Sequence, residues 1–181
     1  MGNYTVVDIN RINKLEETEK MITKAENLRD KFLVSLFYIT GARPGELRRL
    51  LPEHITESDD RVAIKVFTSK LGKAKRFVIT ERVLDYKKPI PFQDIIIKYW
   101  SICKKFPGIP MLNISVRRMQ QIIEVLSDRT FCPYSFRHSR GTKMSIAGAG
   151  ISELMYWKGA TNIGSVSPYL SAKKVPIENI E

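Results

Sequence analysis

The amino-acid sequence predicts a mainly α-helical domain that contains one small antiparallel β-sheet. Several segments carry apolar residues at helical spacing, whereas only two short neighbouring runs, RVAIKVFT (61–68) and KRFVIT (75–80), are rich in β-branched residues. A chain of 181 residues with 43% hydrophobic and 27% charged residues suffices for one globular domain with a sizeable core and leaves little room for two. We therefore expect a single α+β domain.

The first half of the chain predicts two helices and then the sheet. Residues 15–40 show a helical apolar stripe with a break near Asn27. Gly41 ends this helix, and Pro44 suits the first turn of the next one. Beyond His54, SKLGKA separates the two β-branched runs, which predicts a β-hairpin.

The second half predicts helices only. The segments are 91–106, 114–126 starting near Ser115, 133 to about 147, and the short ISELMYWKG (151–159). Gly148 and Gly150 end the third of them.

Basic charge is concentrated after residue 60. The chain has 30 Lys and Arg against 19 Asp and Glu, a net charge of +11, yet residues 1–60 have a net charge of −2 and residues 61–181 one of +13. Such asymmetry indicates a surface that faces a polyanion, most often nucleic acid. A solvated basic surface without a specific partner is the alternative.

Other classes find little support. No run reaches the roughly 18 apolar residues of a membrane span, and the N-terminus lacks an apolar signal-peptide region. Cys103 and Cys132 are far apart, and His54 and His138 are the only histidines, so neither a disulfide framework nor a zinc site is indicated. We expect no metal, no cofactor and a reducing intracellular setting.

Two basic features before residue 80 favour anion binding. Arg43 in TGARPGEL directly precedes a helix N-terminus, where free N–H groups and the helix dipole attract an anion; pairing with Glu46 is the plain alternative. The hairpin segment 61–76 contains no acidic residue, and its turn presents Lys70 and Lys73. Such lysines either protect a sheet edge or reach a backbone phosphate.

Two further features lie near the C-terminus. On a helix that begins at Pro133, Tyr134, Arg137, His138 and Gly141 share one face, and the glycine permits a close approach. A second arginine beside a hydroxyl and an imidazole suggests phosphate binding. Tyr169, in GSVSPYLSAKK, is either a ring that closes the core or a phenol available for chemistry.

Taken together, these motifs resemble the tyrosine recombinase and integrase family over about residues 15–172. TGARPGEL is similar to the family's first arginine motif, PYSFRHSRGT to its His-x-x-Arg-His motif, and KGATNIGSVSPYL to the segment with its nucleophilic tyrosine. SKLG resembles the lysine-bearing hairpin turn of phage integrases. The family order Arg, Lys, Arg, Tyr is reproduced as Arg43, Lys70, Arg137 and Tyr169.

The resemblance implies a site-specific DNA recombinase that cuts and rejoins strands through a 3′-phosphotyrosine, with no metal or cofactor. Tyr169 would be the nucleophile, Arg43 and Arg137 the phosphate clamp, Lys70 or alternatively Lys73 the general acid, and Tyr134 an auxiliary donor. The implied partners are double-stranded DNA and further copies of the chain, with a tetramer on DNA expected of the full protein, in the cytoplasm of a prokaryotic or virus-infected cell. The expected DNA contacts are Lys65, Lys73, Lys75, Arg76, His138, Arg140, Lys143, Lys158, Lys173 and Lys174.

Family members generally carry a separate N-terminal helical domain, so the resemblance implies a catalytic domain alone, with residues 1–14 as an extension, 15–172 as the core and 173–181 as a tail. Two positions depart from the family pattern: Tyr134 stands where histidine is usual, and Ala160 where histidine or tryptophan is usual. Divergent integrases of archaeal viruses and plasmids show similar loosening. Three alternatives stay open: a DNA-binding module that no longer cuts, a type IB topoisomerase-like enzyme and, ranked last, an RNA-binding protein.

Overall fold

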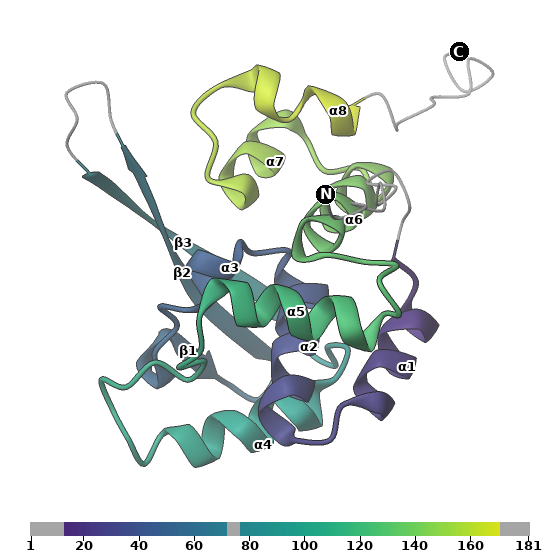
Figure 1. Ribbon diagram of the computed structural model, residues 1–181. Coiled ribbons are helices and arrows are strands. Elements are labelled where there is room, and N and C mark those ends of the chain that lie inside the picture. The colour runs from purple at the N-terminus through teal and green to yellow at the C-terminus, as the bar shows by residue number, and fades with distance from the viewer. Residues whose placement is uncertain (1–12, 72–76, 171–181) are drawn as a thin grey trace.

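The computed structural model describes residues 13–71 and 77–170 and confirms the predicted fold class (Figure 1). The helices of the described residues are α1 (Leu15–Lys24), α2 (Leu28–Thr40), α3 (Pro44–Leu47), α4 (Gln93–Cys103), α5 (Val116–Leu126), α6 (Pro133–Ile146), α7 (Ile151–Lys158) and α8 (Ser167–Leu170), with 3₁₀ turns η1 (Pro52–His54) and η2 (Ile163–Ser165). The strands are β1 (Ile55–Glu57), β2 (Arg61–Leu71) and β3 (Phe77–Lys87). None of these helices is both long and apolar enough to cross a bilayer.

Helix α2 is the centre of the domain and contacts α1, α4, α5 and α6. Asn27 begins it by accepting a hydrogen bond from Asp30 N (2.9 Å), which explains the predicted break between α1 and α2. Phe32, Leu33 and Leu36 are completely buried, and a helix that is apolar on nearly all sides belongs in a core.

The sheet has the antiparallel order β1-β2-β3. The β2–β3 hairpin is longer than predicted and extends away from the helices in Figure 1. Alternate residues face inward: Val62, Ile64 and Val66 on β2 are buried, as are Arg82 and Leu84 on β3. Strand β1, which was not predicted, pairs Ile55 with Ile64.

The C-terminal third of the chain packs against both helix α2 and the sheet. Helix α6 contacts α2, α7 contacts β3, and α8 returns to α6 (Figure 1). The N-terminal side also joins this region, because buried Asn13 donates its backbone N–H to Ser139 Oγ on α6 (2.8 Å). The fold therefore brings the α2–α3 turn, the sheet and the segment before Tyr169 to one place.

Candidate active site

Arg43 lies where the chain turns from α2 into α3. Gly41 has a left-handed backbone (φ 57°), and a Cβ there would lie 2.9 Å from Trp157 Cζ2, so only glycine fits the turn. The Arg43 N–H donates to Glu46 Oε2 (2.8 Å) and its guanidinium donates to Glu46 Oε1 (3.0 Å). The side chain of Arg43 remains 37% exposed, so it pairs with Glu46 and is still reachable from solvent.

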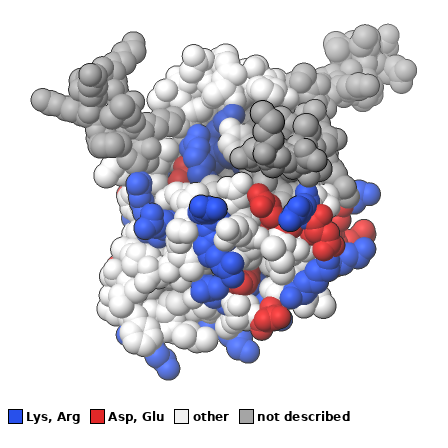
Figure 2. Space-filling model, in the orientation of Figure 1, with Lys and Arg blue, Asp and Glu red and all other residues white. Residues whose placement is uncertain are grey.

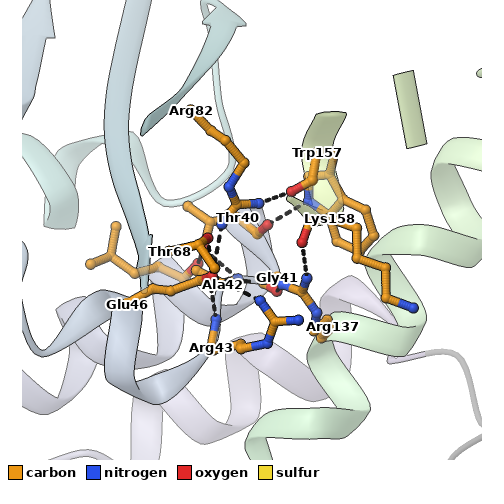
Figure 3. A network of polar contacts seen from close by, with 11 residues as sticks. Thr40, Gly41, Ala42, Arg43, Glu46, Thr68, Arg82, Arg137, Trp157 and Lys158 are labelled. Carbon is orange, nitrogen blue, oxygen red and sulfur yellow. Dashed lines mark hydrogen bonds and ion pairs between the residues drawn. The ribbon is translucent and has the colours of Figure 1, made fainter. Parts of the chain in front are cut away.

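Glu46 is a buried carboxylate that several donors share (Figure 3). Its Oε1 also accepts a hydrogen bond from Thr68 (2.6 Å) and lies 2.9 Å from Arg82 Nη2, while Oε2 lies 3.9 Å from Arg137 Nη1. Burial alone would raise the pKa of Glu46, but Arg82, the hydrogen bonds from Thr68 and Arg43, and Arg137 outweigh it and hold the pKa below its usual range. The carboxylate is therefore charged at neutral pH.

Arg137, on α6, is 1% exposed and points its guanidinium between the α2–α3 turn and the end of α7. It donates to Gly41 O (2.9 Å) and Lys158 O (2.7 Å), and its guanidinium carbon Cζ lies 5.1 Å from the centre of the Trp157 ring. Its Nε has no hydrogen-bond partner among the described residues. Burial and the charge of Arg43 lower the pKa of Arg137 to about 10, so it stays charged near pH 7.

Tyr169 is 3% exposed and its ring rests directly on Gly141. A Cβ at 141 would lie 2.7 Å from the Cε1 and Cζ atoms of the ring, which confirms the predicted close approach. His138 and Trp157 meet the ring edge-on, with centroids 5.3 and 6.1 Å away. Burial raises the pKa of the phenol above its usual range, and Arg137 offsets part of that effect. The ring is thus buried and also lies within the field of the arginines.

Lys158 approaches the same ring from the end of α7. Its ammonium lies 4.9 Å from the centre of the Tyr169 ring and donates to Ser165 O. Ala160 packs against the core and supplies no side-chain donor. The Tyr156 hydroxyl instead accepts a hydrogen bond from Val83 N (3.0 Å) on the sheet. Of the side chains on α7, Lys158 and Trp157 therefore contact the tyrosine.

The remaining predicted residues of α6 differ in their surroundings. Tyr134 is 58% exposed, and its phenol contributes to the raised pKa of Tyr169. His138 Nδ1 lies 3.4 Å from Thr142 Oγ1. Lys143 donates to Asn13 O (2.7 Å) and Tyr38 OH (3.2 Å), and the Arg140 guanidinium lies 5.7 Å from the Tyr86 ring. Arg140 and Lys143 therefore already contact protein groups, and their contacts to DNA stay predictions.

The hairpin residues are only partly described. Lys65 forms an ion pair with Glu81 (3.1 Å). Lys70 lies opposite Val78 near the end of β2. Lys73, Lys75 and Arg76, like the tail residues Lys173 and Lys174, lie outside the described residues. The choice between Lys70 and Lys73 stays open.

Charge is unevenly spread over the face in Figure 2. Lys and Arg side chains run down its middle, while most Asp and Glu side chains lie to the right. Helix α1, on the same side in Figure 1, carries Glu16, Glu17 and Glu19. Among residues 13–71 and 77–170, no group of three or more His, Cys, Asp or Glu side chains is placed to hold a metal ion.

A helical domain in which a small sheet, two arginines and a buried tyrosine meet defines the class of the tyrosine recombinase catalytic domain. The chain belongs to the phage integrase family, whose sequence profile matches residues 5–175. It is 25% identical over 195 residues to the tyrosine recombinase XerD of Staphylococcus haemolyticus (strain JCSC1435), covering 97% of this chain and 60% of that protein. Tyrosine recombinase XerC of Leptospira interrogans serogroup Icterohaemorrhagiae serovar copenhageni is 23% identical over 188 residues, covering 94% and 56%.

Solved structures show the same fold. The crystal structure of XerA recombinase has a TM-score of 0.65 at 18% identity and covers 90% of this chain and 62% of that one. XerH site-specific recombinase bound to difH substrate has a TM-score of 0.64 at 17% identity and covers 88% and 49%. The chain thus spans about 60% of the length of the curated relatives.

Glu46, Thr68 and Arg82 belong to the site but were not predicted as parts of it. Glu46 was considered only as a surface partner of Arg43, and Arg82 lay beyond the predicted strand. The signal for Arg82 is period two: it precedes Leu84 by two residues and so shares the inward face of the strand. Thr68 likewise continues the inward-facing positions of β2, two residues after Val66.

Proposed function

We propose that this domain cleaves and rejoins DNA strands through a tyrosine–phosphate intermediate, as a site-specific recombinase or integrase. The observation that carries the proposal is that the buried Tyr169 ring meets the Trp157 ring, which also contacts the Arg137 guanidinium, next to the partly exposed Arg43. The phenol loses its proton to solvent, its oxygen bonds to phosphorus, and the bond from phosphorus to the 5′-oxygen breaks. The resulting 3′-phosphotyrosine keeps the bond energy, so a 5′-hydroxyl of another strand can reverse the step without ATP.

The two arginines act on the charge that develops on the phosphorus. Attack places negative charge on the non-bridging oxygens, and preorganised guanidinia stabilise it without reorganisation. Arg137 is held by Gly41 O and Lys158 O and still has a free Nε donor, and Arg43 is partly exposed beside it. The geometry supports a clamp on one phosphodiester.

We assign proton transfer and an additional hydrogen bond to the phosphate to residues that flank the two arginines. We assign to Lys70, or to Lys73, the proton that the leaving 5′-oxygen takes up, since an ammonium is a competent general acid. Tyr134 supplies an auxiliary hydrogen bond to a phosphate oxygen.

The substrate is double-stranded DNA, on which copies of the full protein assemble as a tetramer, in the cytoplasm of a prokaryotic or virus-infected cell. The net charge of +13 after residue 60 supports a polyanionic partner. The solved XerH structure contains its difH substrate. Affinity for a duplex should fall steeply with salt, because released counterions drive binding. Equal affinity at about 50 and 200 mM salt would contradict this basis for binding.

Covalent capture tests the proposal. The chain is incubated with nicked duplexes that carry a randomised central segment, and protein–DNA adducts are separated on a denaturing gel and sequenced. We expect an adduct with the parent chain and none with Tyr169→Phe. An adduct in Tyr169→Phe would refute the nucleophile. Absence of any adduct would support a binding module that no longer cuts, and relaxation of supercoiled plasmid without a sequence requirement would indicate a topoisomerase-like enzyme.

A further inference from the structure

Arg82 is a third arginine of the site and is as deeply buried as Arg137, at 2% exposure. It lies on the inward face of β3, opposite the apolar Val66 on β2 and two residues before the apolar Leu84 on its own strand. Burying a guanidinium is costly unless its charge and its donors are matched. Its contacts must therefore explain why an arginine occupies a core position of the sheet.

The first contact is with the end of α7. Arg82 Nη1 donates to Trp157 O, and Arg137 Nη2 donates to the next carbonyl, Lys158 O (2.7 Å). A helix C-terminus leaves its last carbonyls unpaired, so the two guanidinia satisfy two successive orphan acceptors (Figure 3). Gly159 then turns left-handed (φ 61°), and a Cβ there would lie 3.1 Å from Arg82 Nε. The segment that leads to Tyr169 thus starts directly against Arg82.

The second contact is with the carboxylate of Glu46. Arg82 Nη2 lies 2.9 Å from Oε1, the same oxygen that accepts from Arg43 Nη1 at 3.0 Å, while Arg137 Nη1 lies 3.9 Å from Oε2. One buried anion is thus shared by three cations. The electrostatic effect of Arg82 on the carboxylate exceeds that of Arg137. Without Arg82, Glu46 would have only Arg43 and Arg137 to neutralise it.

We propose that Arg82 is a positioning residue for the cleavage reaction: it neutralises Glu46, so that Arg43 and Arg137 stay available to a phosphate. This inference rests on the proposed function and assigns to Arg82 a role through other protein groups, namely Glu46 and the end of α7. Because Arg82 lies on the strand that pairs with the Lys70 strand, it also links the hairpin to the segment that carries Tyr169.

Three variants test the charge of Arg82 separately from its shape. Arg82→Lys keeps the charge, Arg82→Gln keeps a donor without charge, and Arg82→Gln with Glu46→Gln removes both charges. The probe is a nicked duplex that gives an adduct with the parent chain, and the readouts are the single-turnover rate at saturating DNA and the DNA concentration at half-maximal rate. Arg61→Gln, which loses only an exposed pair with Asp85 on the same sheet, is the matched control.

We expect Arg82→Gln to lower the maximal rate about 10- to 100-fold, the range for a lost charge-assisted hydrogen bond, with the half-maximal DNA concentration changed less than about threefold. Arg82→Lys should retain at least about ten times the rate of Arg82→Gln, because the ammonium still offsets the carboxylate. The double variant should recover at least about fivefold over Arg82→Gln, since no uncompensated carboxylate remains to bind Arg43 and Arg137. Arg61→Gln should match the parent.

Arg82→Gln at the parent rate, or a double variant slower than Arg82→Gln, would overturn the inference. If Arg82→Gln does not fold, as judged by thermal unfolding, the double variant is compared with Glu46→Gln alone. Rates within about threefold of each other then support the inference, and a loss of more than about tenfold overturns it. Failure of the proposed function is distinguishable, because the parent chain itself would then give no adduct.

Discussion

Replacing Gly141 with alanine tests whether the pocket that holds Tyr169 is the position from which the phenol attacks. A Cβ at 141 would lie 2.7 Å from Tyr169 Cε1 and Cζ, whereas ordinary van der Waals contact begins at 3.4 Å. The ring must therefore move by about 0.7 Å, the difference between these two distances. Because a misplacement of about 1 Å can cost about 100-fold in rate, we expect Gly141→Ala to slow adduct formation about 10- to 100-fold.

Gly141→Ala should change the stability of the fold only moderately. Overpacking lowers the free energy of unfolding by about 1–3 kcal/mol, whereas alanine in place of glycine inside a helix raises it by about 1 kcal/mol. Gly141 lies in the middle of α6, so both effects apply and the free energy of unfolding should fall by at most about 2 kcal/mol. In a domain of this size that lowers the melting temperature by no more than about 8 °C. Loss of folded protein at 25 °C would therefore not explain the loss of rate.

The assay is the single-turnover rate of adduct formation on the captured duplex, together with thermal unfolding. Gly45→Ala is the matched control, since Gly45 is also helical and a Cβ there meets nothing within 4 Å. We expect Gly45→Ala to be at least as stable as the parent. A parent-like rate in Gly141→Ala would refute the assignment of this pocket to catalysis. A faster rate would identify it as a resting position that the phenol must leave.

Three further predictions follow from the same network. Glu46→Gln should lower the free energy of unfolding by about 3 kcal/mol at pH 7. Burial would raise the pKa of Glu46, but Arg82 helps to hold it below its ordinary value near 4.3, so this stabilisation is complete above about pH 4.3 and is lost as pH falls through the folded-state pKa. The free energies of unfolding of the parent and of Glu46→Gln, measured by urea titration, should approach each other as the pH falls. A difference between them that stays constant from about pH 7 to 3 would contradict this. Lys158→Met removes the ammonium 4.9 Å from the Tyr169 ring and should slow adduct formation about 5- to 10-fold at saturating DNA; weaker DNA binding at an unchanged maximal rate would show a contact to DNA instead. Gly159→Ala should cost about 2 kcal/mol in thermal unfolding, because φ is 61° and the Cβ would lie 3.1 Å from the Arg82 Nε, and a parent-like melting temperature would contradict that strain.

Local signals in the sequence predicted where the helices begin and turn. Asn27 and Ser115 each accept a backbone N–H three residues ahead, at 2.9 and 3.1 Å, as their residue types at those places indicate. Gly41 adopts the left-handed conformation expected after a helix. These interactions span only a few residues, so the order of side chains along the chain suffices to predict them.

Local patterns in the sequence did not indicate contacts between distant segments, and only the family resemblance implied that Arg43, Arg137 and Tyr169 come together. The hairpin was predicted to end at residue 80, so Arg82 was not recognised as an inward residue, although its spacing to Leu84 has period two. The sequence left open whether the Tyr169 ring closes the core or is available for chemistry, and its burial in α8 against α6 depends on tertiary packing. Pairing of Arg82 with Glu46 and with Trp157 O depends on how β3, α3 and α7 pack, which no local pattern encodes.

The charge balance of the network explains why three arginines meet one glutamate. Arg43, Arg82 and Arg137 carry three positive charges and Glu46 one negative charge, so the cluster has a net excess of two positive charges. A phosphodiester carries one negative charge, and attack by a phenolate adds a second one on the way to pentacoordinate phosphorus. The excess therefore matches the transition state better than the bound substrate, which is the condition for binding energy to accelerate the chemical step. Removing Glu46 would raise the excess to three and favour the ground state as well, whereas removing Arg82 would lower it to one and leave the transition state undercompensated. In the proposed reaction the glutamate and the third arginine would thus set the magnitude of the field, while Arg43 and Arg137 would direct it at the phosphate.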